Sequence, residues 1–400
     1  MASGRNTSIG IDIGTSSVKV IAVERLDENN VGILPKVIGY GTSESKGIRH
    51  GYIANIGEVA KSIRTAVAHC EKNSGLKIRK AYLSVGGVGL SAIIGVGVVN
   101  TTKADSEITD LDVRRAIEES EKELPAAYIN NRKIIHSVAL EYRVDGKRVL
   151  GRPQGMKGIR LEARVLYITC QTHHLTDMLL AVEEAGIEIE DVVASPMASS
   201  LVALNKTQKI AGCVLVNIGA ETTSMIVFEN NIPISLEVFP IGSTDITNDI
   251  ALGLQISLEE AELVKTHAPN APVISRKKLD GIIEARLSDI FELIDAHLKK
   301  IDRSGLLPAG IIMIGGGSSL VGIEQAARSA LHLPSKCATI KYESAFKYVH
   351  EKQTEWVVAY GLGILGLNSE DENTVDIKEG MRIIGKTRHT VWKWIKQFLP

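Results

Sequence analysis

The stretch IDIGTSSVKVIAVE (residues 11–24) decides the fold of this chain, because VNIGAETTSMIVFE (residues 216–229) aligns with it without a gap. The alignment pairs Asp12 with Asn217, and in both copies a glycine follows two residues later. Each copy reads as an apolar strand, a tight turn and a returning strand, which is the pattern of a β-hairpin. Any two hairpins share this outline, but the matched positions favour a duplication, which predicts two similar lobes facing each other.

Strand-like and helical segments alternate along the rest of the chain. Apolar, β-branched runs such as AYLSVGG, VLYITC and IIMIGGG are separated by segments with helical periodicity at 56–72, 110–123, 175–186, 245–266 and 278–301. This alternation predicts α/β domains built on mixed sheets. A glycine-rich region with short strand signals at 85–160 interrupts the pattern, and we interpret it as an inserted α/β subdomain.

Composition excludes several classes of protein. Hydrophobic residues make up 44% of the 400 residues and charged residues 23%, which is typical of a folded chain of two or three domains. The formal net charge is −1 and no basic run is interleaved with aromatic residues, so we expect no nucleic-acid partner. The N-terminus lacks a signal-peptide pattern and no apolar stretch reaches the roughly 18 residues of a spanning helix, so we expect a cytoplasmic protein that does not cross the membrane.

Cysteine and histidine give no indication of a metal site. The four cysteines lie far apart without a CxxC pair, mostly in apolar runs, which predicts buried, reduced thiols. The adjacent His173 and His174 point in different directions on any helix or strand, so we expect packing or surface roles rather than shared metal binding.

The first hairpin turn carries groups that bind anions. An apolar strand ends at Asp12, Gly14 allows a tight turn, and Thr15 and Ser16 offer N–H groups and hydroxyls before Lys19 on the returning strand. Successive N–H groups in a turn form an anion-binding nest, and a carboxylate at a strand end holds hydrated Mg²⁺. We therefore predict a polyphosphate site with Asp12 on Mg²⁺ through water; a plain hairpin turn is the alternative.

A triple glycine marks a second candidate site. IIMIGGGSSLVGIEQAA (311–327) predicts a buried strand, a glycine turn and a helix with Ser318 or Ser319 as its N-cap. Glycines let a ligand approach the backbone, and a helix N-terminus favours a phosphate or a nucleoside hydroxyl. The alternative is an ordinary turn between a strand and a helix, although three consecutive glycines are entropically unfavourable without a reason.

Two further patterns concern helices. In DIALGLQISLEEAELVK (249–265), Glu262 and Lys265 lie three residues apart and share a helical face, either as part of a site or as a solvated surface pair. GLGILG (361–366) matches G-x-G-x-x-G, but it follows a helical run and lacks a βαβ unit, so we interpret it as a close helix contact. No G-x-x-x-x-G-K-[ST] pattern occurs, which excludes a P-loop.

Together, the two opposed hairpins, the Glu–Lys helix and the late triple glycine resemble the actin, Hsp70 and sugar-kinase superfamily, which clamps ATP between two lobes. The first hairpin resembles that superfamily's first phosphate motif, VLVNIGAETTSM its second, and IMIGGGSSL its adenosine motif. Essentially the whole chain is similar to the FtsA family of bacterial cell-division proteins, notably in GIRLEARVLYITC, AVEEAGIEIEDVVASPMASSLVAL, GSTDITNDIALGL, EEAELVK and KTRHTVWKWIKQFLP.

This resemblance implies an actin-like (ribonuclease H-like) two-lobed α/β fold with an inserted 1C-type subdomain and a C-terminal amphipathic helix. The implied boundaries are 1–84 and 161–196 for lobe 1 (1A), 85–160 for the 1C-type subdomain, 197–240 and 306–367 for lobe 2 (2A), 241–305 for subdomain 2B, 368–385 for a linker and 386–400 for the membrane-targeting helix.

The resemblance also implies a nucleotide, ATP or ADP with Mg²⁺, between the lobes. The residues that would contact it are Asp12, Gly14, Thr15, Ser16, Lys19, Asn217, Gly219, Ala220, Glu221, Thr222, Glu262, Lys265, Gly315, Gly316, Gly317 and Ser318. Glu262 and Lys265 would flank ribose and adenine, and the three glycines would back the adenosine.

The second phosphate motif departs from the superfamily pattern. Where the superfamily usually has Asp-x-Gly-Gly-Gly-Thr and a further Asp, this chain has Asn217, Ala220, Glu221, Thr222 and Ser224. An asparagine has no charge, so it is a poorer Mg²⁺ partner and no general base. Glu221 would repel phosphates unless it points away or reaches the metal. We therefore expect a nucleotide-occupied structural switch with weak or absent ATP hydrolysis.

The last residues predict an amphipathic helix. At about 100° per residue, Val391, Trp392, Trp394, Ile395, Phe398 and Leu399 share an arc of roughly 160°, with Lys393 and Lys396 on the opposite side. Tryptophans beside cations after the acidic linker NSEDENTVDIKEG favour a helix in the lipid headgroup plane, as the resemblance also implies. The alternatives are docking on the chain's own core or in a partner's groove.

Energetic magnitudes indicate how such a helix would work. Burying each apolar side chain yields about 1.5–3 kcal/mol and each cation adds about 1 kcal/mol at an anionic leaflet, whereas ordering each residue costs about 1–2 kcal/mol. These terms nearly cancel, so one tail should bind weakly and a row of linked copies tightly. Self-association into filaments is therefore expected, as in an actin-like polymer.

The resemblance finally implies partners. These are the C-terminal peptide of the tubulin-like FtsZ, with Arg286 on the helix 278–300 as a contact, anionic lipids of the inner face of the cytoplasmic membrane at the division site, and later divisome proteins through the 1C region. Two rivals share the fold. A PilM-like soluble peptide-binding adaptor of pilus assembly would not need the basic, tryptophan-bearing tail, and a small-molecule kinase would need the carboxylate that Asn217 lacks.

Overall fold

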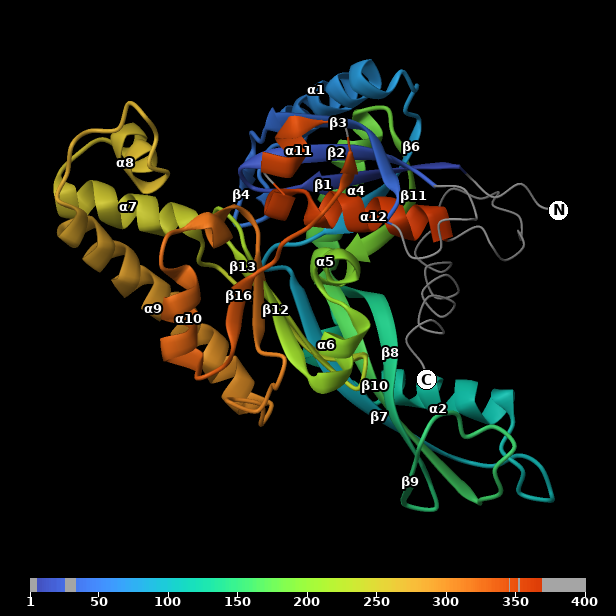
Figure 1. Ribbon diagram of the computed structural model, residues 1–400. Helices are drawn as coiled ribbons and strands as arrows, with labels where there is room; N and C mark the ends of the chain where they lie inside the picture. Colours follow the sequence, from blue (N-terminus) through green and yellow to red (C-terminus); the bar gives the residue numbers. More distant parts are fainter. Residues whose placement is uncertain (1–5, 26–33, 345, 352, 369–400) are drawn as a thin grey trace.

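A computed structural model of the chain describes residues 6–25, 34–344, 346–351 and 353–368 (Figure 1). The predicted membrane-targeting helix at 386–400, with all its membrane-binding residues, lies outside the described residues. So does the predicted linker 368–385, except for Asn368. Among the described residues, no helix has both the length and the apolar character needed to span a bilayer.

Lobe 1 is built on a mixed sheet with the order β11-β6-β1-β2-β3-β17. In that order the strands are Glu188–Ala194, Lys80–Val85, Thr7–Ile13, Ser17–Glu24, Lys36–Glu44 and Glu343–Ser344. β1 and β2 form the predicted first hairpin, antiparallel with Asp12 opposite Lys19, and β1 runs parallel to β6. A short hairpin of β4 (Ile48–Arg49) and β5 (Tyr52–Ile53) follows β3.

Helices cover both faces of this sheet, which explains why its central strands are apolar almost throughout. Helix α1 (Ile56–Ser74) begins after Asn55, whose side chain accepts a hydrogen bond from the Glu58 N–H, and ends at Gly75, which has a positive φ. Helix α4 (Thr172–Glu184) lies beside α1, and α5 (Ser195–Ala203) and α12 (Val357–Asn368) cover the other face (Figure 1).

Lobe 2 repeats this arrangement. Its sheet has the order β14-β13-β12-β15-β16, with strands Ile232–Phe239, Thr223–Glu229, Cys213–Ile218, Ile311–Ile314 and Ser335–Cys337. β12 and β13 form an antiparallel hairpin with Asn217 opposite Ser224, and β12 runs parallel to β15. The run β15-β12-β13-β14 therefore has the same order and directions as β6-β1-β2-β3, which confirms the predicted duplication.

The helical pattern predicted at 245–266 is two helices. Helix α7 (Ser243–Leu254) ends because Gln255 takes a left-handed conformation with φ 58°. Ser257 then starts α8 (Leu258–Lys265) through a reciprocal cap with Glu260. The rest of lobe 2 comprises α6 (Lys206–Ala211), α9 (Arg276–Lys300), the 3₁₀ turn η1 (Gly316–Ser319) and α10 (Ile323–Leu331). The short α11 (Lys347–Glu351) lies on lobe 1, where Tyr348 stacks on Tyr40 of β3, and the 3₁₀ turn η2 (Gln353–Glu355) leads into α12 (Figure 1).

The inserted subdomain is an antiparallel sheet with one helix-covered face. Its order is β7-β10-β8-β9, with strands Leu90–Asn100, Arg160–Gln171, Arg132–Val144 and Lys147–Val149. Helix α2 (Asp110–Lys122) packs on β7 at Gly95 and Gly97, and the short α3 (Ala126–Ile129) follows. The predicted boundary at residue 160 falls at the start of β10, which stays in this sheet as far as Gln171.

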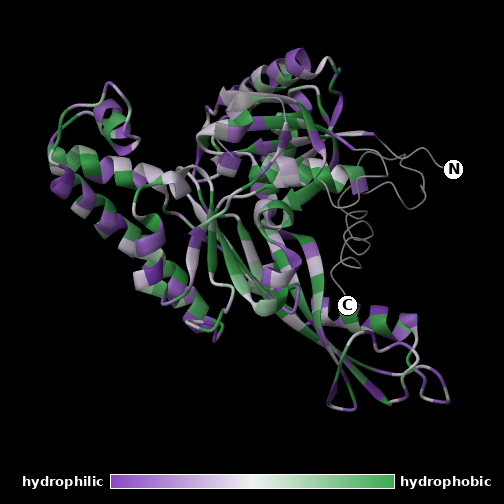
Figure 2. Ribbon diagram, in the orientation of Figure 1, coloured by the Kyte–Doolittle hydropathy of each residue, from purple (hydrophilic) through white to green (hydrophobic). Residues whose placement is uncertain are grey.

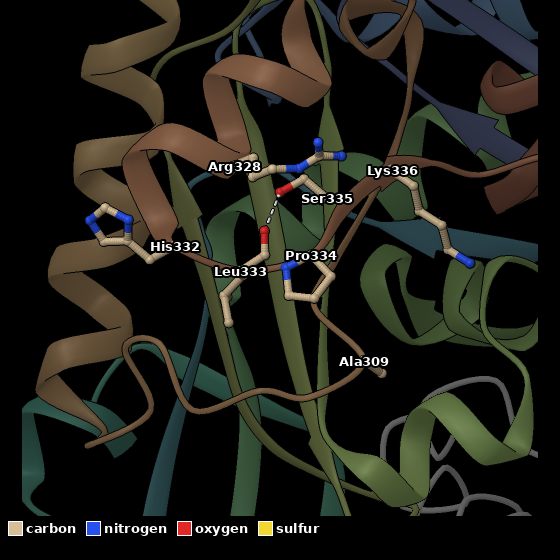
Figure 3. Close-up of a pocket in the computed structure, with 7 residues that line it drawn as sticks. All are labelled: Ala309, Arg328, His332, Leu333, Pro334, Ser335 and Lys336. Atoms are coloured by element: carbon tan, nitrogen blue, oxygen red, sulfur yellow. Dashed lines mark hydrogen bonds between the residues drawn. The ribbon is translucent and has the colours of Figure 1, made fainter.

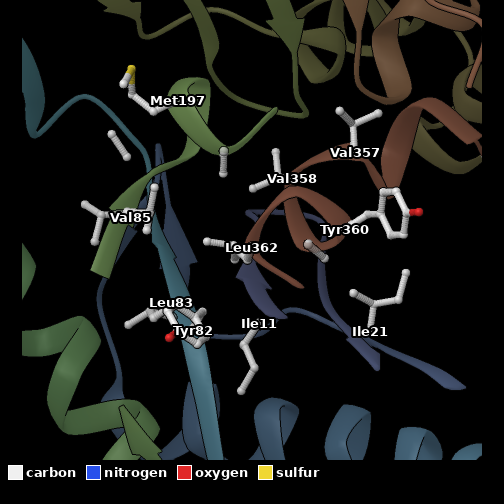
Figure 4. Close-up of a cluster of buried hydrophobic side chains, with 14 of the residues drawn as sticks. Ile11, Ile21, Tyr82, Leu83, Val85, Met197, Val357, Val358, Tyr360 and Leu362 are labelled. Atoms are coloured by element: carbon white, nitrogen blue, oxygen red, sulfur yellow. The ribbon is translucent and has the colours of Figure 1, made fainter. Parts of the chain in front are cut away.

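Apolar residues concentrate where the layers meet. In Figure 2 the strands of both lobes are mainly hydrophobic, while α1 and α9 alternate hydrophobic and hydrophilic residues. Figure 4 shows one part of this core, in which Ile11 and Leu83 of the lobe 1 sheet lie beneath Val358 and Leu362 of α12. The same buried cluster extends through α5 to one face of the lobe 2 sheet, so α5 and α12 join the two lobes.

The glycines of GLGILG are required for close helix packing, as predicted. A Cβ on Gly361 would lie 2.1 Å from the carbonyl oxygen of Ala198 in α5, and one on Gly366 would lie 1.9 Å from Ser8 Oγ. Such distances leave no room for a side chain, so α12 approaches α5 and β1 at backbone contact. The motif therefore sets helix packing and is not a dinucleotide-binding loop.

Replacing Gly361 with alanine is expected to lower the free energy of unfolding by about 1–3 kcal/mol, because α12 must move away from α5. Gly281 of α9 is the matched control, since a Cβ there would meet nothing within 4 Å. Gly281→Ala is expected to stabilise the protein by about 0.5–1 kcal/mol through helix propensity. Thermal unfolding followed by circular dichroism measures both. Equal melting temperatures for the two variants would contradict the close contact.

The cysteines and the two adjacent histidines take the packing and surface positions predicted for them. The four thiols are free, three buried and Cys337 partly so, and burial raises the pKa of each to about 12. His174 is buried with Nε2 2.8 Å from the carbonyl oxygen of Gly86, whereas His173 is exposed beside Asp177. These two side chains therefore share no ligand.

Candidate nucleotide-binding cleft

The two hairpin turns have the same backbone geometry. The Gly14 N–H donates to the Ser17 carbonyl oxygen at 3.1 Å, and the Gly219 N–H donates to the Thr222 carbonyl oxygen at 2.9 Å. These bonds occupy matching positions in the duplicated sequences. Each turn therefore presents its middle residues to the space between the lobes.

The first turn places opposite charges side by side. Asp12 is half-buried, and its Oδ1 accepts a hydrogen bond from Ser84 at 2.7 Å. Burial raises the pKa of Asp12, while Lys19 and the Ser84 bond oppose this rise. Lys19 Nζ donates to Ser17 Oγ at 2.7 Å and lies 3.9 Å from Glu355. The lysine is thus held by its own hairpin with its charge facing the cleft.

The triple glycine closes against the second hairpin. Gly315 has a φ of 87°, and a Cβ there would lie 2.3 Å from Asn217 Oδ1. The Gly315 N–H donates to the Thr354 carbonyl oxygen at 3.1 Å. The position therefore needs glycine for both its conformation and its packing, which accounts for part of the costly glycine run.

The predicted N-cap at Ser318 or Ser319 is wrong. Their hydroxyls donate back to the carbonyl oxygens of Gly315 and Gly316, at 2.7 and 2.8 Å, within a 3₁₀ turn. Helix α10 begins later, after Gly322, whose φ is 81°. A local hydroxyl-to-carbonyl bond competed with helix capping here.

The Glu262–Lys265 pair belongs to a partly buried hydrogen-bond network. Lys265 is only 8% exposed, and its Nζ lies 2.6 Å from Glu262 Oε2 and 2.8 Å from Thr247 Oγ1 of α7. It also donates to the Ser243 carbonyl oxygen at 3.1 Å. A solvated surface pair is therefore the wrong interpretation for Lys265, although half of the Glu262 side chain is exposed.

These elements surround one cavity of about 510 Å³. Every predicted nucleotide-contacting residue lines it except Glu221 and Ser318. Ser318 is buried, and its neighbour Ser319 lines the cavity instead. Glu221 turns away from the cavity, because its Oε2 accepts the His50 N–H of lobe 1 at 2.6 Å.

The cavity also has walls that the sequence motifs missed. They come from the β4–β5 turn, the residues after β6, α4, α5, the start of α7, the residues after α8, η2 and the start of α12, and include Gly51, Gly86, Gly87, Met178, Ser195, Ser243, Thr266, His267, Thr354, Glu355 and Val358. The pair Gly86–Gly87 ends a strand parallel to β1, and carboxyl ends of parallel strands commonly carry sites. Glu355 had no such signal, since it reaches the cleft only through the return of the chain to lobe 1.

The donor set fits a hydrated Mg²⁺ rather than a metal caged by protein. Within residues 6–368, as far as the structure describes them, no group of three or more His, Cys, Asp or Glu side chains could hold a metal ion. Mg²⁺ commonly keeps several waters and takes one or two carboxylates together with substrate phosphates. Asp12 beside the first turn satisfies that requirement.

A second depression, of about 730 Å³, is a poor candidate site. It lies in lobe 2 around Leu333 and Pro334, with three basic side chains nearby. Figure 3 shows that Arg328, His332 and Lys336 point in different directions. Divergent cations do not form a shared anion site.

Arg286 is already engaged by intramolecular carboxylates. Its guanidinium donates to both carboxylate oxygens of Asp249, at 2.6 and 3.0 Å, and lies 3.2 Å from Asp289. The bond to Asp249 raises the pKa of Arg286. A peptide carboxylate would have to share this cation, so the predicted contact stays a prediction.

Two family models match the chain. "Cell division protein FtsA" matches residues 214–361, and "SHS2 domain inserted in FTSA" matches residues 88–169. The cell division protein FtsA of Bacillus subtilis is 32% identical, covering 84% of this chain and 79% of that protein. This chain belongs to the FtsA family of bacterial cell-division proteins.

Other relatives extend the match along the chain. FtsA of Pseudomonas aeruginosa is 28% identical, covering 82% of this chain and 81% of that protein. FtsA of Escherichia coli K12 is 23% identical, covering 99% of this chain and 97% of that protein. The family resemblance and the cell-division role inferred from the sequence are therefore confirmed.

Solved structures confirm the actin-like fold. A chain of the "PilM-PilN type IV pilus biogenesis complex" superposes with a TM-score of 0.67 at 18% identity, over 90% of this chain and 98% of that chain. MreB5 of Spiroplasma citri bound to AMPPNP gives 0.50 at 12% identity, over 90% and 96%. At these identities the likeness shows the fold alone, so it does not favour a PilM-like role over that of the FtsA family.

Proposed function

We propose that this FtsA-family protein binds ATP or ADP with Mg²⁺ between its lobes and tethers the division ring to the cytoplasmic membrane. Residues 386–400 would lie on the inner leaflet, copies would assemble into filaments, and the C-terminal peptide of FtsZ would bind subdomain 2B. The observation that carries the nucleotide part is the pair of equivalent hairpin turns on opposite walls of one cavity. The membership in the FtsA family supports the division role.

The cavity suggests how each part of the nucleotide would be held. The N–H groups of Thr15 and Ser16 and the charge of Lys19 suit phosphates, while Asp12 would orient the waters of Mg²⁺, which offsets phosphate charge. The Glu262–Lys265 network suits ribose hydroxyls because it is already ordered by Thr247. The triple glycine leaves room for the adenosine.

We expect slow or absent ATP hydrolysis. Asn217 stands where a charged general base would act, so the second turn cannot take a proton from water. Glu355 also lines the cavity, with its carboxylate 3.9 Å from Lys19, and is therefore the remaining candidate base that the assay has to test. A steady-state phosphate-release assay should give a rate below about 1 s⁻¹, the lower end of ordinary enzyme turnover.

A faster rate of ATP hydrolysis would overturn the interpretation of the protein as a nucleotide-occupied structural switch. Glu355→Gln then identifies the cause, since a rate that falls in this variant would make Glu355 the base. Asn217→Asp is the complementary variant, because it restores the usual carboxylate and should raise hydrolysis if the rest of the site is intact.

A further inference from the structure

Glu221 forms a bridge between the two lobes. Its Oε2 accepts the His50 backbone N–H at 2.6 Å, and its own carbonyl oxygen lies 3.3 Å from His50 Nδ1. Glu221 belongs to the β12–β13 turn of lobe 2, whereas His50 lies in the β4–β5 turn of lobe 1. This pair of contacts is termed the Glu221 clasp.

The lobe 2 end of the clasp is fixed. The Ser243 N–H donates to the Gly219 carbonyl oxygen at 2.9 Å, and the Thr244 N–H donates to the Ala220 carbonyl oxygen at 2.8 Å. Both donors belong to the first turn of α7. The turn that carries Glu221 is therefore anchored to a helix before it reaches across.

The lobe 1 end is also fixed. His50 has a φ of 47°, and Gly51 lies so close to Gly87 that a Cβ would come within 2.4 Å of the Gly87 Cα. Tyr52 donates its hydroxyl to Gln171 Oε1 at 3.0 Å. The His50 N–H is thus presented by a braced hairpin, and the clasp joins two rigid parts.

The position of the clasp matters because its neighbours form the cavity walls. Gly51 and Gly87 line the cavity from lobe 1, and Ala220 lines it from lobe 2. Separating the lobes at this edge would open the end that holds the two phosphate turns. A bond that resists this separation would therefore resist the exit of a bound polyphosphate.

We propose that Glu221 is a positioning residue that holds the lobes closed and slows nucleotide release. The proposal rests on the proposed nucleotide binding and assigns a purpose to a residue that departs from the superfamily pattern. In this position the carboxylate accepts a charge-assisted hydrogen bond, which is stronger than a neutral one. It points away from the cavity, which removes most of the expected repulsion.

If Glu221 instead acted mainly by repelling phosphates, its removal would change the rate of nucleotide release in the opposite direction. If Glu221 mainly repelled phosphates, removal of its charge would slow nucleotide release. If it holds the lobes together, removal of the acceptor will speed release. Glu221→Ala removes both the charge and the acceptor, whereas Glu221→Gln removes the charge and keeps an acceptor oxygen.

Stopped-flow release of a fluorescent ADP from the full chain separates these interpretations. Glu221→Ala is expected to release ADP about tenfold faster than the wild type, and Glu221→Gln at a rate between the two. The control is Glu183→Ala, which removes an exposed carboxylate on α4 and should leave the rate unchanged. Slower release from both Glu221 variants would overturn the proposal, as would unchanged release from Glu221→Ala.

A second measurement tests the clasp without nucleotide. Spin labels on Lys61→Cys in α1 and Lys277→Cys in α9, with Cys337→Ser to remove the partly exposed thiol, report the distance between lobes. Glu221→Ala should lengthen or broaden that distance, and an unchanged distribution would contradict the clasp. If the wild type bound no nucleotide, the proposed function would fail. The distance measurement would still show whether Glu221 holds the two lobes together.

Discussion

A chain that ends at residue 380 is expected to stay in solution when centrifuged with anionic vesicles, while the full chain pellets at least tenfold more strongly. The predicted apolar arc of Val391, Trp392 and Trp394, continued to Leu399, is suited to a headgroup plane. Removing it deletes both the apolar side chains that we expect to enter the headgroup region and the lysines that favour an anionic leaflet. Vesicle sedimentation of the two proteins side by side measures the difference.

The controls separate specific binding to anionic lipid from non-specific adsorption to vesicles. Full-length protein should pellet poorly with neutral vesicles, and Trp394→Glu should resemble the truncation, because a carboxylate on the apolar side opposes burial. Pelleting should also rise steeply with protein concentration, since a single tail binds weakly and linked copies bind together. Equal pelleting of the full and truncated chains would remove the membrane part of the proposal.

The two hairpins of the cleft were predictable from the sequence because the duplicated segments share one local pattern. Asp12 and Asn217 align in the sequence, lie at equivalent positions in hairpins of identical topology, and line one cavity. Strand, turn and strand are local features, so the period of the apolar residues and the glycines predicts them. The duplication predicted that the two hairpins face each other, and the resemblance to the actin superfamily implied a nucleotide cleft between them.

Contacts between segments that are far apart in the sequence could not be predicted from such local patterns. Glu221 meets His50 across 171 positions, and Glu355 reaches Lys19 only because the segment before α12 returns to lobe 1. The local pattern of apolar residues and glycines does not indicate which residues from distant segments meet in space. The helix break at Gln255 was missed for a different reason, since a left-handed glutamine carries none of the glycine or proline signals that mark helix ends.

The charge of Lys19, on a mostly buried side chain that faces the cleft, leads to the second large effect. Lys19→Ala is expected to weaken ADP binding about 100-fold, measured by titration calorimetry with Mg²⁺ present. Removing one partner of a buried charge pair costs about 2–5 kcal/mol, and about 1.4 kcal/mol corresponds to a factor of ten. Lys19 is 13% exposed, lies opposite Asp12 in the hairpin register and stands 3.9 Å from Glu355. Without Lys19, the carboxylates of Asp12 and Glu355 would face the phosphates, and the first hairpin would supply no cation.

The matched control is Lys80→Ala, because Lys80 lies on the same sheet but pairs with Glu188 at the surface. That variant should bind ADP as the wild type does. Lys19→Arg keeps the charge and should recover part of the affinity, which separates the loss of a cation from a loss of folding. An affinity within threefold of the wild type for Lys19→Ala, in a protein with an unchanged melting temperature, would mean that the phosphates do not lie at the first turn. The resemblance of the two hairpins would then reflect shared ancestry of the lobes without a shared ligand.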